Sequence, residues 1–145
     1  MTPLVVGVGN AWRGDDGAGP AVVLALGLGD RVVQHEREPS ALIGLWEHED
    51  EVVLVDTVRS GARAGTVHRI DLHESSLPPE LSRGSTHAFG LAETVELARA
   101  LDRLPARLEL YGIEGSAFEA GRGLQPEVAR AVDRVVEELA ERLGA

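Results

Sequence analysis

The side chains able to do chemistry in this chain are mainly carboxylates, hydroxyls and histidines, because its 145 residues include no cysteine and all 14 basic residues are arginine. The missing cysteine excludes thiolate metal sites and cysteine nucleophiles. The missing lysine excludes P-loop and Schiff-base chemistry. Any metal must therefore be bound by oxygen atoms and imidazole rings.

The most informative stretch is residues 7–19, in which glycines surround two adjacent carboxylates, Asp15 and Asp16. A dinucleotide-binding fingerprint would need glycine where Trp12 stands, and an acidic pair is electrostatically wrong for a pyrophosphate. Two interpretations stay open for the carboxylates. They cap the helix that follows, or they bind a ligand at the end of the preceding strand.

Two further candidates lie downstream. Asp56 ends the apolar run 52–55, which favours a place in the crevice at the carboxyl edge of a sheet, although Asp also begins ordinary turns. His87 stands at the expected start of a helix, where the positive end of the dipole disfavours a protonated ring and keeps a nitrogen available for coordination. A purely structural histidine is the alternative. The other four histidines are predicted to be structural or solvated, namely His35, His48, His68 and His73.

The elements that must position these residues follow from an alternation of apolar, β-branched runs with stretches of helical period, which predicts an α/β fold. Strands are expected at 4–8, 31–35, 52–55, 65–71 and 108–113, the fourth of them at an edge or antiparallel. Helices are expected over 20–26, over 40–48 with Ser40 as the cap, along a face formed by Leu91, Val95, Ala98 and Leu101, and from Pro126 to Leu143. An irregular loop is expected over 72–84.

The predicted fold is a single domain over residues 1–145: a three-layer α/β/α sandwich whose twisted, mostly parallel five-stranded sheet has helices on both faces. A net charge of −10 argues against a nucleic-acid partner. No apolar run approaches the ~20 residues of a membrane helix, and the apolar start at residues 3–8 does not look like an export signal. We therefore expect a cytoplasmic protein without a membrane partner, and nothing requires more than a monomer.

The string Gly-x-Gly-Asn-x-x-x-x-Asp-Asp-Gly-x-Gly at residues 7–19 resembles the N-terminal motif of the nickel-iron hydrogenase maturation proteases. Two later motifs are similar to the same family, Val-Asp-Thr-Val-x-x-Gly at 55–61 and Ser/Thr-x-His-x-x-Gly-Leu at 85–91. Residues 111–115 and 123–128 look like the family's last strand and the lead into its C-terminal helix. The resemblance thus covers nearly the whole chain.

The resemblance implies that Asp16, Asp56 and His87 form the catalytic and metal-binding site, with Asp15 as the neighbouring acid. The metal implied is the nickel of the substrate, with zinc or cadmium as surrogates, and such an oxygen and imidazole set suits a divalent cation. The activity implied is that of an endopeptidase that recognises nickel in a hydrogenase large-subunit precursor and removes a short C-terminal extension. An attacking water could be activated by the metal or by Asp16 or Asp56, or the metal could only anchor the substrate.

One departure from the family concerns residues 36–40, Glu-Arg-Glu-Pro-Ser, which stand where many members have an Asp-Gly-Gly-Thr-type loop. This leaves any role of Glu38 open. Trp12 is predicted either to contact the precursor or to pack over the first helix. The loop 72–84 is also predicted to contact the precursor.

Two other functions are weighed against the peptidase. Peptidyl-tRNA hydrolase shares the Gly-x-Gly-Asn start, but the acidic charge and the absence of that family's Arg-His-Asn continuation argue against it. A non-catalytic module that binds a metal or a nucleotide is the second alternative.

Overall fold

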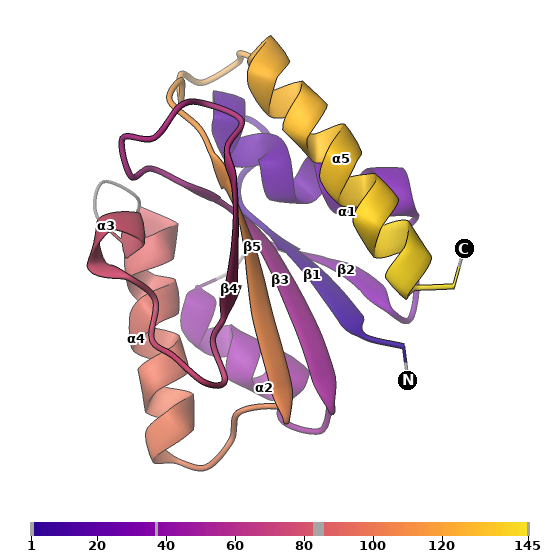
Figure 1. Cartoon of the computed structure of the whole chain (residues 1–145), viewed down its shortest axis with the longest axis vertical. Coiled ribbons are helices and arrows are strands. Elements are labelled where there is room, and N and C mark those ends of the chain that lie inside the picture. Colours follow the sequence, from indigo (N-terminus) through magenta and orange to yellow (C-terminus); the bar gives the residue numbers. More distant parts are fainter. Residues whose placement is uncertain (1, 37, 83–85, 145) are drawn as a thin grey trace.

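The computed structural model describes residues 2–36, 38–82 and 86–144, and it describes side chains except those of residues 82–89. A five-stranded sheet runs through the middle of the molecule (Figure 1). Its strands are β1 (Leu4–Val8), β2 (Val32–His35), β3 (Glu51–Val58), β4 (Val67–Asp71) and β5 (Arg107–Glu114). The spatial order is β2-β1-β3-β5-β4, with β4 the antiparallel edge strand and the other neighbours parallel. The predicted sheet is confirmed.

Helices cover both faces of this sheet, as the three-layer prediction requires. The α-helices are α1 (Ala18–Leu26), α2 (Leu42–Trp46), α3 (Pro79–Ser82), α4 (Thr86–Ala100) and α5 (Pro126–Arg142), and the 3-10 turns are η1 (Gly14–Gly17) and η2 (Pro39–Ala41). Helices α1 and α5 lie on one face, and α2, α3 and α4 lie on the other (Figure 1). None of the helices described is long and apolar enough to span a bilayer.

The central strands are apolar along their whole length because they are buried from both sides. In β3, Val53 and Val55 face the core beneath α1 and α5, whereas Val52 and Leu54 face the core beneath α2 and α4. All four side chains are fully buried. Continuous burial is typical of parallel strands that are sandwiched between helices.

Several local expectations need correction. The helix expected over 40–48 is a 3-10 turn followed by α2, and Ser40 lies inside the turn and does not cap the helix. The short helix α3 interrupts the loop expected over 72–84. Leu101 lies beyond the end of α4 and is 51% exposed, whereas Leu91, Val95 and Ala98 are buried as predicted. Strand β3 continues past residue 55 because its last residues still pair with β5.

The order of the strands creates a crevice at the carboxyl ends of β1 and β3. The connection from β1 leads outward to β2, and the chain then returns on the other face to β3, on the opposite side of β1. Gly19 of α1 packs against this edge so closely that a Cβ atom there would overlap Val8 O and Val55 O. Open α/β sheets bind ligands at such switch points. The fold therefore directs attention to the residues that follow β1 and end β3.

Candidate active site

Asp16 lies in η1, the turn that connects β1 to α1, and its side chain is only 4% exposed. The backbone N–H of Asn10 donates to Asp16 Oδ2 at 2.9 Å. Gly9 has a φ of 135°, and a Cβ atom there would overlap Asp16 O, so only glycine lets the loop fold back this tightly. Residue 16 is inside the turn, and the N-cap residues of η1 and α1 are Arg13 and Gly17. Asp16 is therefore not the N-cap residue of either helix.

Asp56 lies near the carboxyl end of β3, beside Gly112 of β5, and its side chain is fully buried. The backbone N–H of Thr57 donates to Asp56 Oδ1 at 2.7 Å. This residue belongs to the strand and does not begin a turn. The structure thus brings Asp16 and Asp56 to the same edge of two adjacent strands, as their positions in the sequence predicted.

Asp15 is a buried hub that joins three segments near this edge. Its carboxylate accepts hydrogen bonds from the N–H groups of Ser116, Ala117 and Gln125 at 2.9–3.0 Å and from the Gln125 side-chain amide at 2.5 Å. Its carbonyl accepts a 2.6 Å hydrogen bond from the hydroxyl of Thr57, the neighbour of Asp56. Asp15 therefore positions the two candidate carboxylates relative to each other.

The ionisation of Asp15 follows from these contacts. Burial by itself would raise the pKa of this carboxyl, but hydrogen bonds from Gln125, Ser116 and Ala117 outweigh burial and lower the pKa below its ordinary value of 3.8. The group is therefore charged at neutral pH and holds the loop after β5 in place. Asp15, like Asp16, lies in the first turn of η1 and is not its N-cap residue.

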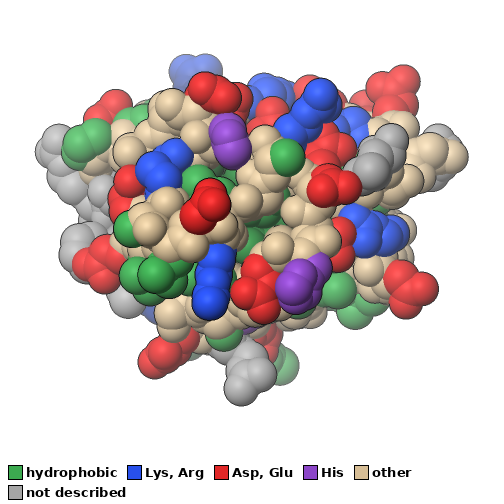
Figure 2. Space-filling model, turned by 90° about the horizontal axis from the view of Figure 1, so that it is seen from below, with side chains coloured by type: hydrophobic (Ala, Val, Ile, Leu, Met, Phe, Trp, Pro, Cys, Tyr) green, Lys and Arg blue, Asp and Glu red, His purple; other side chains and the backbone are tan. Residues whose placement is uncertain are grey.

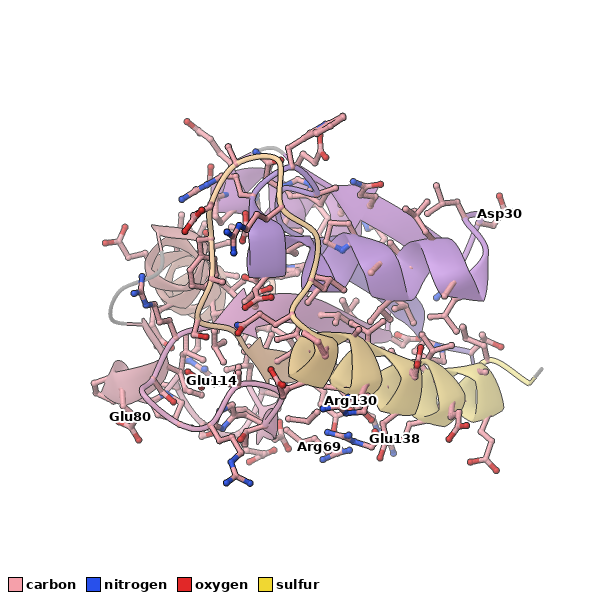
Figure 3. All side chains as sticks on the ribbon, turned by 90° about the horizontal axis from the view of Figure 1, so that it is seen from above. Asp30, Arg69, Glu80, Glu114, Arg130 and Glu138 are labelled. Carbon is pink, nitrogen blue, oxygen red and sulfur yellow. The ribbon has the colours of Figure 1, made fainter. Side chains whose placement is uncertain are left out.

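Glu114 is a buried carboxylate that is absent from the set of site residues predicted from the sequence. It ends β5 and is 1% exposed. It accepts hydrogen bonds from the N–H groups of Ser60 and Gly61 and from the Ser60 hydroxyl, and His68 Nε2 lies 3.1 Å from Oε1. Figure 3 shows Glu114 among the loops at the carboxyl edge, whereas Asp30 and Glu80 lie at the periphery. Its place after an apolar strand, like that of Asp56, was the signal that could have found it.

The histidine of the predicted set begins α4. The backbone of His87 is in the first turn of that helix, as expected, but its side chain lies outside the part that the structure describes. Across the side chains that are described, no three His, Asp or Glu residues gather closely enough to hold a metal ion. The assignment of Asp16, Asp56 and His87 as catalytic and metal-binding residues therefore stays a prediction.

The other four histidines occupy structural or exposed positions, as predicted. His35 is buried and contacts Glu38 O at 3.0 Å, and His73 contacts Pro105 O at 2.9 Å. His68 belongs to the Glu114 cluster. His48 is exposed on the surface.

Trp12 stands out on the loop that carries Asp16, because it is 76% exposed. It does not pack over α1, so that interpretation is wrong. Near the other end of this edge, a groove of about 370 Å³ separates η2 from α4. Its lining residues include Glu38, Ser40 and Gly90, the last of which is three residues after His87.

Comparison with known proteins points to one family. A family model for hydrogenase maturation proteases matches residues 37–142. A putative hydrogenase maturation protease of Methanocaldococcus jannaschii is 30% identical over 144 residues, which cover 92% of this chain and 91% of that protein. The hydrogenase 2 maturation protease of Escherichia coli is 27% identical and covers 96% of this chain and 88% of that protein.

Solved structures point to the same group. The hydrogenase maturating endopeptidase HybD from E. coli has a TM-score of 0.78 and 28% identity, with coverage of 96% of this chain and 90% of that one. An endopeptidase from E. coli, solved in solution, has a TM-score of 0.82 and 28% identity, with coverage of 99% and 92%. The chain therefore belongs to the hydrogenase maturation protease family, whose members are endopeptidases.

Proposed function

We propose that this endopeptidase removes a C-terminal extension from a hydrogenase large-subunit precursor and that Asp16, Asp56 and His87 bind the nickel of that precursor. The observation that carries the proposal is the pair Asp16 and Asp56, two buried carboxylates at the carboxyl edge of the adjacent strands β1 and β3. Carboxylate oxygens and an imidazole suit a divalent metal such as nickel, with zinc or cadmium as surrogates.

Recognition through the metal would make cleavage depend on nickel insertion. A precursor without nickel lacks the group that the three side chains bind, so the enzyme would bind it more weakly than the nickel-loaded form. The cytoplasm as the place of action, a monomeric state and the absence of membrane or nucleic-acid partners belong to the same proposal.

Cleavage of the peptide bond needs a water to attack the scissile carbonyl and a group to accept its proton. Asp16 or Asp56 is the base in this proposal, because both are held by backbone N–H groups at the edge where the substrate would enter. The proton then passes to the departing amine, so that the products are a carboxylic acid and a free amine. The groove between η2 and α4 offers a place for the extension beside the first turn of α4.

The decisive experiment compares nickel-loaded with nickel-free hydrogenase precursor as substrate, with the products weighed by mass spectrometry. We expect trimming of the nickel-loaded form alone. Equal trimming of both forms would refute recognition through the metal, and trimming of neither would refute the proposed substrate.

Two variants test the proposed residues in the same assay. Asp56→Asn and His87→Ala should each lower the cleavage rate by about 10²–10³-fold or more, since removal of one group that stabilises the transition state typically costs that much. His48→Ala is the matched control, because His48 is on the exposed surface. Full activity of His87→Ala would remove that histidine from the site.

A further inference from the structure

Trp12 is held in an exposed position by a loop whose backbone is anchored on both sides of it. Its N–H donates to Asn10 Oδ1 at 2.9 Å, and its carbonyl accepts from the N–H of Gly121 at 2.9 Å. The following Arg13 N–H donates to Asn10 O at 3.2 Å. Gly14 has a φ of 56°, and a Cβ atom there would overlap Ala117 O. The indole is thus displayed on a rigid support.

Because Trp12 stays exposed, folding gains little stabilisation from its side chain. Burial of apolar area contributes about 25 cal/mol per Å², and an indole carries one of the largest apolar surfaces of any side chain. The other tryptophan, Trp46, follows the usual pattern, because it is fully buried and its Nε1 donates to Arg103 O. A rigid, exposed aromatic side chain is typical of an interface anchor, since little conformational entropy is lost when a partner covers it.

The position of Trp12 identifies which partner it meets. The residue that accepts its N–H, Asn10, donates its own N–H to Asp16 Oδ2, so Trp12 belongs to the loop that holds the candidate active site. Arg13 is its neighbour in the chain, and Arg122 follows Gly121, whose N–H donates to Trp12 O. Both arginines are exposed, and Arg122 also pairs with Glu119 at 3.3 Å. Tryptophan and arginine are the residue types most enriched in the energetically dominant part of protein interfaces.

We infer that Trp12 is an anchor for the protein substrate: it inserts into an apolar pocket on the surface of the precursor next to the scissile end, and Arg13 and Arg122 contact the rim of that pocket. The inference rests on the proposed function, because it assigns the same precursor to this surface. It adds a determinant of affinity that lies outside the metal-binding residues. Trp12 contributes to binding of the folded substrate and takes no part in bond cleavage.

The kinetic test uses Trp12→Ala, Trp12→Phe and the control Leu24→Ala with the nickel-loaded precursor. Leu24 is 57% exposed on α1, so its truncation removes a comparably exposed apolar side chain elsewhere. We expect KM to rise on the order of 30-fold for Trp12→Ala with kcat unchanged, because a hot-spot residue contributes that factor or more. Trp12→Phe should recover part of the loss, and Leu24→Ala should behave as wild type.

A binding measurement gives an independent readout. Enzyme labelled with 5-fluorotryptophan has two fluorine resonances, from Trp12 and Trp46, and Trp12→Phe assigns them. Addition of unlabelled precursor should shift the resonance of Trp12 and leave that of Trp46 in place. Because Trp12 is exposed, denaturant unfolding of the variants should match wild type and exclude misfolding as the cause.

The outcomes separate the two proposals. Cleavage by wild type together with an unchanged KM for Trp12→Ala would overturn the anchor and leave the proposed function intact. A Trp12 resonance that does not move on saturation with precursor would also overturn it. Failure of wild-type enzyme to cleave or bind the precursor would overturn both.

Discussion

The two edges of the sheet hold their carboxylates in opposite ways. At the carboxyl edge, Asp15 and Glu114 are buried, and their hydrogen bonds come mainly from backbone N–H groups and neutral side chains. At the amino edge, acidic side chains pair with arginines in partly exposed ion pairs, such as Arg142 with Glu109 and Arg31 with Glu49. Figure 2, which views that edge, shows acidic and basic side chains interspersed.

This difference has a physical consequence. Neutral donors stabilise a carboxylate and leave its full negative charge in place, whereas an arginine cancels it. The carboxyl edge therefore keeps anionic groups in fixed positions, which is what a cation-binding site requires. The amino edge also has a cavity of about 400 Å³, lined by residues that include Glu51, Asp71 and Arg142. Its mixed charges lie at the opposite end of the strands from Asp16 and Asp56.

The largest expected effect on stability is that of Asp15→Asn. Four N–H groups donate to the Asp15 carboxylate. The asparagine amide has the same size, but its NH2 group cannot accept a hydrogen bond, so some of these donors lose their acceptor. Buried donors left without acceptors cost about 1–3 kcal/mol each, so we expect the free energy of unfolding in urea to fall by about 3 kcal/mol or more. Asp30→Asn, at an exposed position, is the control. A loss of under about 1 kcal/mol would contradict the role of Asp15 in joining the three segments.

Glu114→Gln should have a somewhat smaller effect, because the partners of Oε1, the Ser60 hydroxyl and His68 Nε2, can also accept a hydrogen bond from the new amide. We expect a loss of about 2 kcal/mol in the free energy of unfolding. Glu109→Gln in the same strand is the matched control, since Glu109 is a partly exposed ion-pair partner of Arg142. That control should lose less than about 1 kcal/mol. Equal losses of unfolding free energy for the two variants would show that the carboxylates of the two edges contribute equally to stability.

The pH dependence of Asp15 supplies a third test. Its pKa in the folded protein is lowered, so the unfolded chain takes up the proton first as the pH falls. The stabilisation is therefore fully present above the unfolded pKa of about 3.9 and is lost as the pH falls through the folded pKa. The difference in unfolding free energy between wild type and Asp15→Asn should shrink from pH 7 to pH 3. A difference that grows as the pH falls would show that the pKa of Asp15 is not lowered in the folded protein.

The smallest effect is expected at the amino edge. Glu49→Gln removes the 2.8 Å ion pair with Arg31, in which both side chains are partly exposed. Such pairs contribute about 0–1 kcal/mol, and salt screens them. We expect a loss below 1 kcal/mol in low salt that disappears in about 1 M NaCl, measured by urea unfolding. A loss comparable to that of Asp15→Asn would show that the amino edge is no less critical than the carboxyl edge.

The peptidase interpretation rested on local motifs, and these motifs were sufficient to identify the family. Membership of the hydrogenase maturation protease family decides against peptidyl-tRNA hydrolase, which shares only the short Gly-x-Gly-Asn start. The location of Asp16 and Asp56 at the carboxyl edge also followed from the sequence, because a residue that ends or follows a buried parallel strand lies at that edge. The predictions that Ser40 caps a helix and that Leu101 lies on its buried face were wrong, because tertiary packing decides how a helix begins and ends.

The sequence alone determined the α/β class, the paired carboxylates and the absence of thiol and lysine chemistry, since these depend on residue type and on periods of a few residues. Only the tertiary structure decided that Asp15 is a hub, that Glu114 joins Ser60 and His68, and that Trp12 is exposed. Asp15 meets partners about 100 residues away, and no local pattern encodes which loop will supply a donor. The sequence specifies which groups must be satisfied, and the packing of distant loops selects the partners.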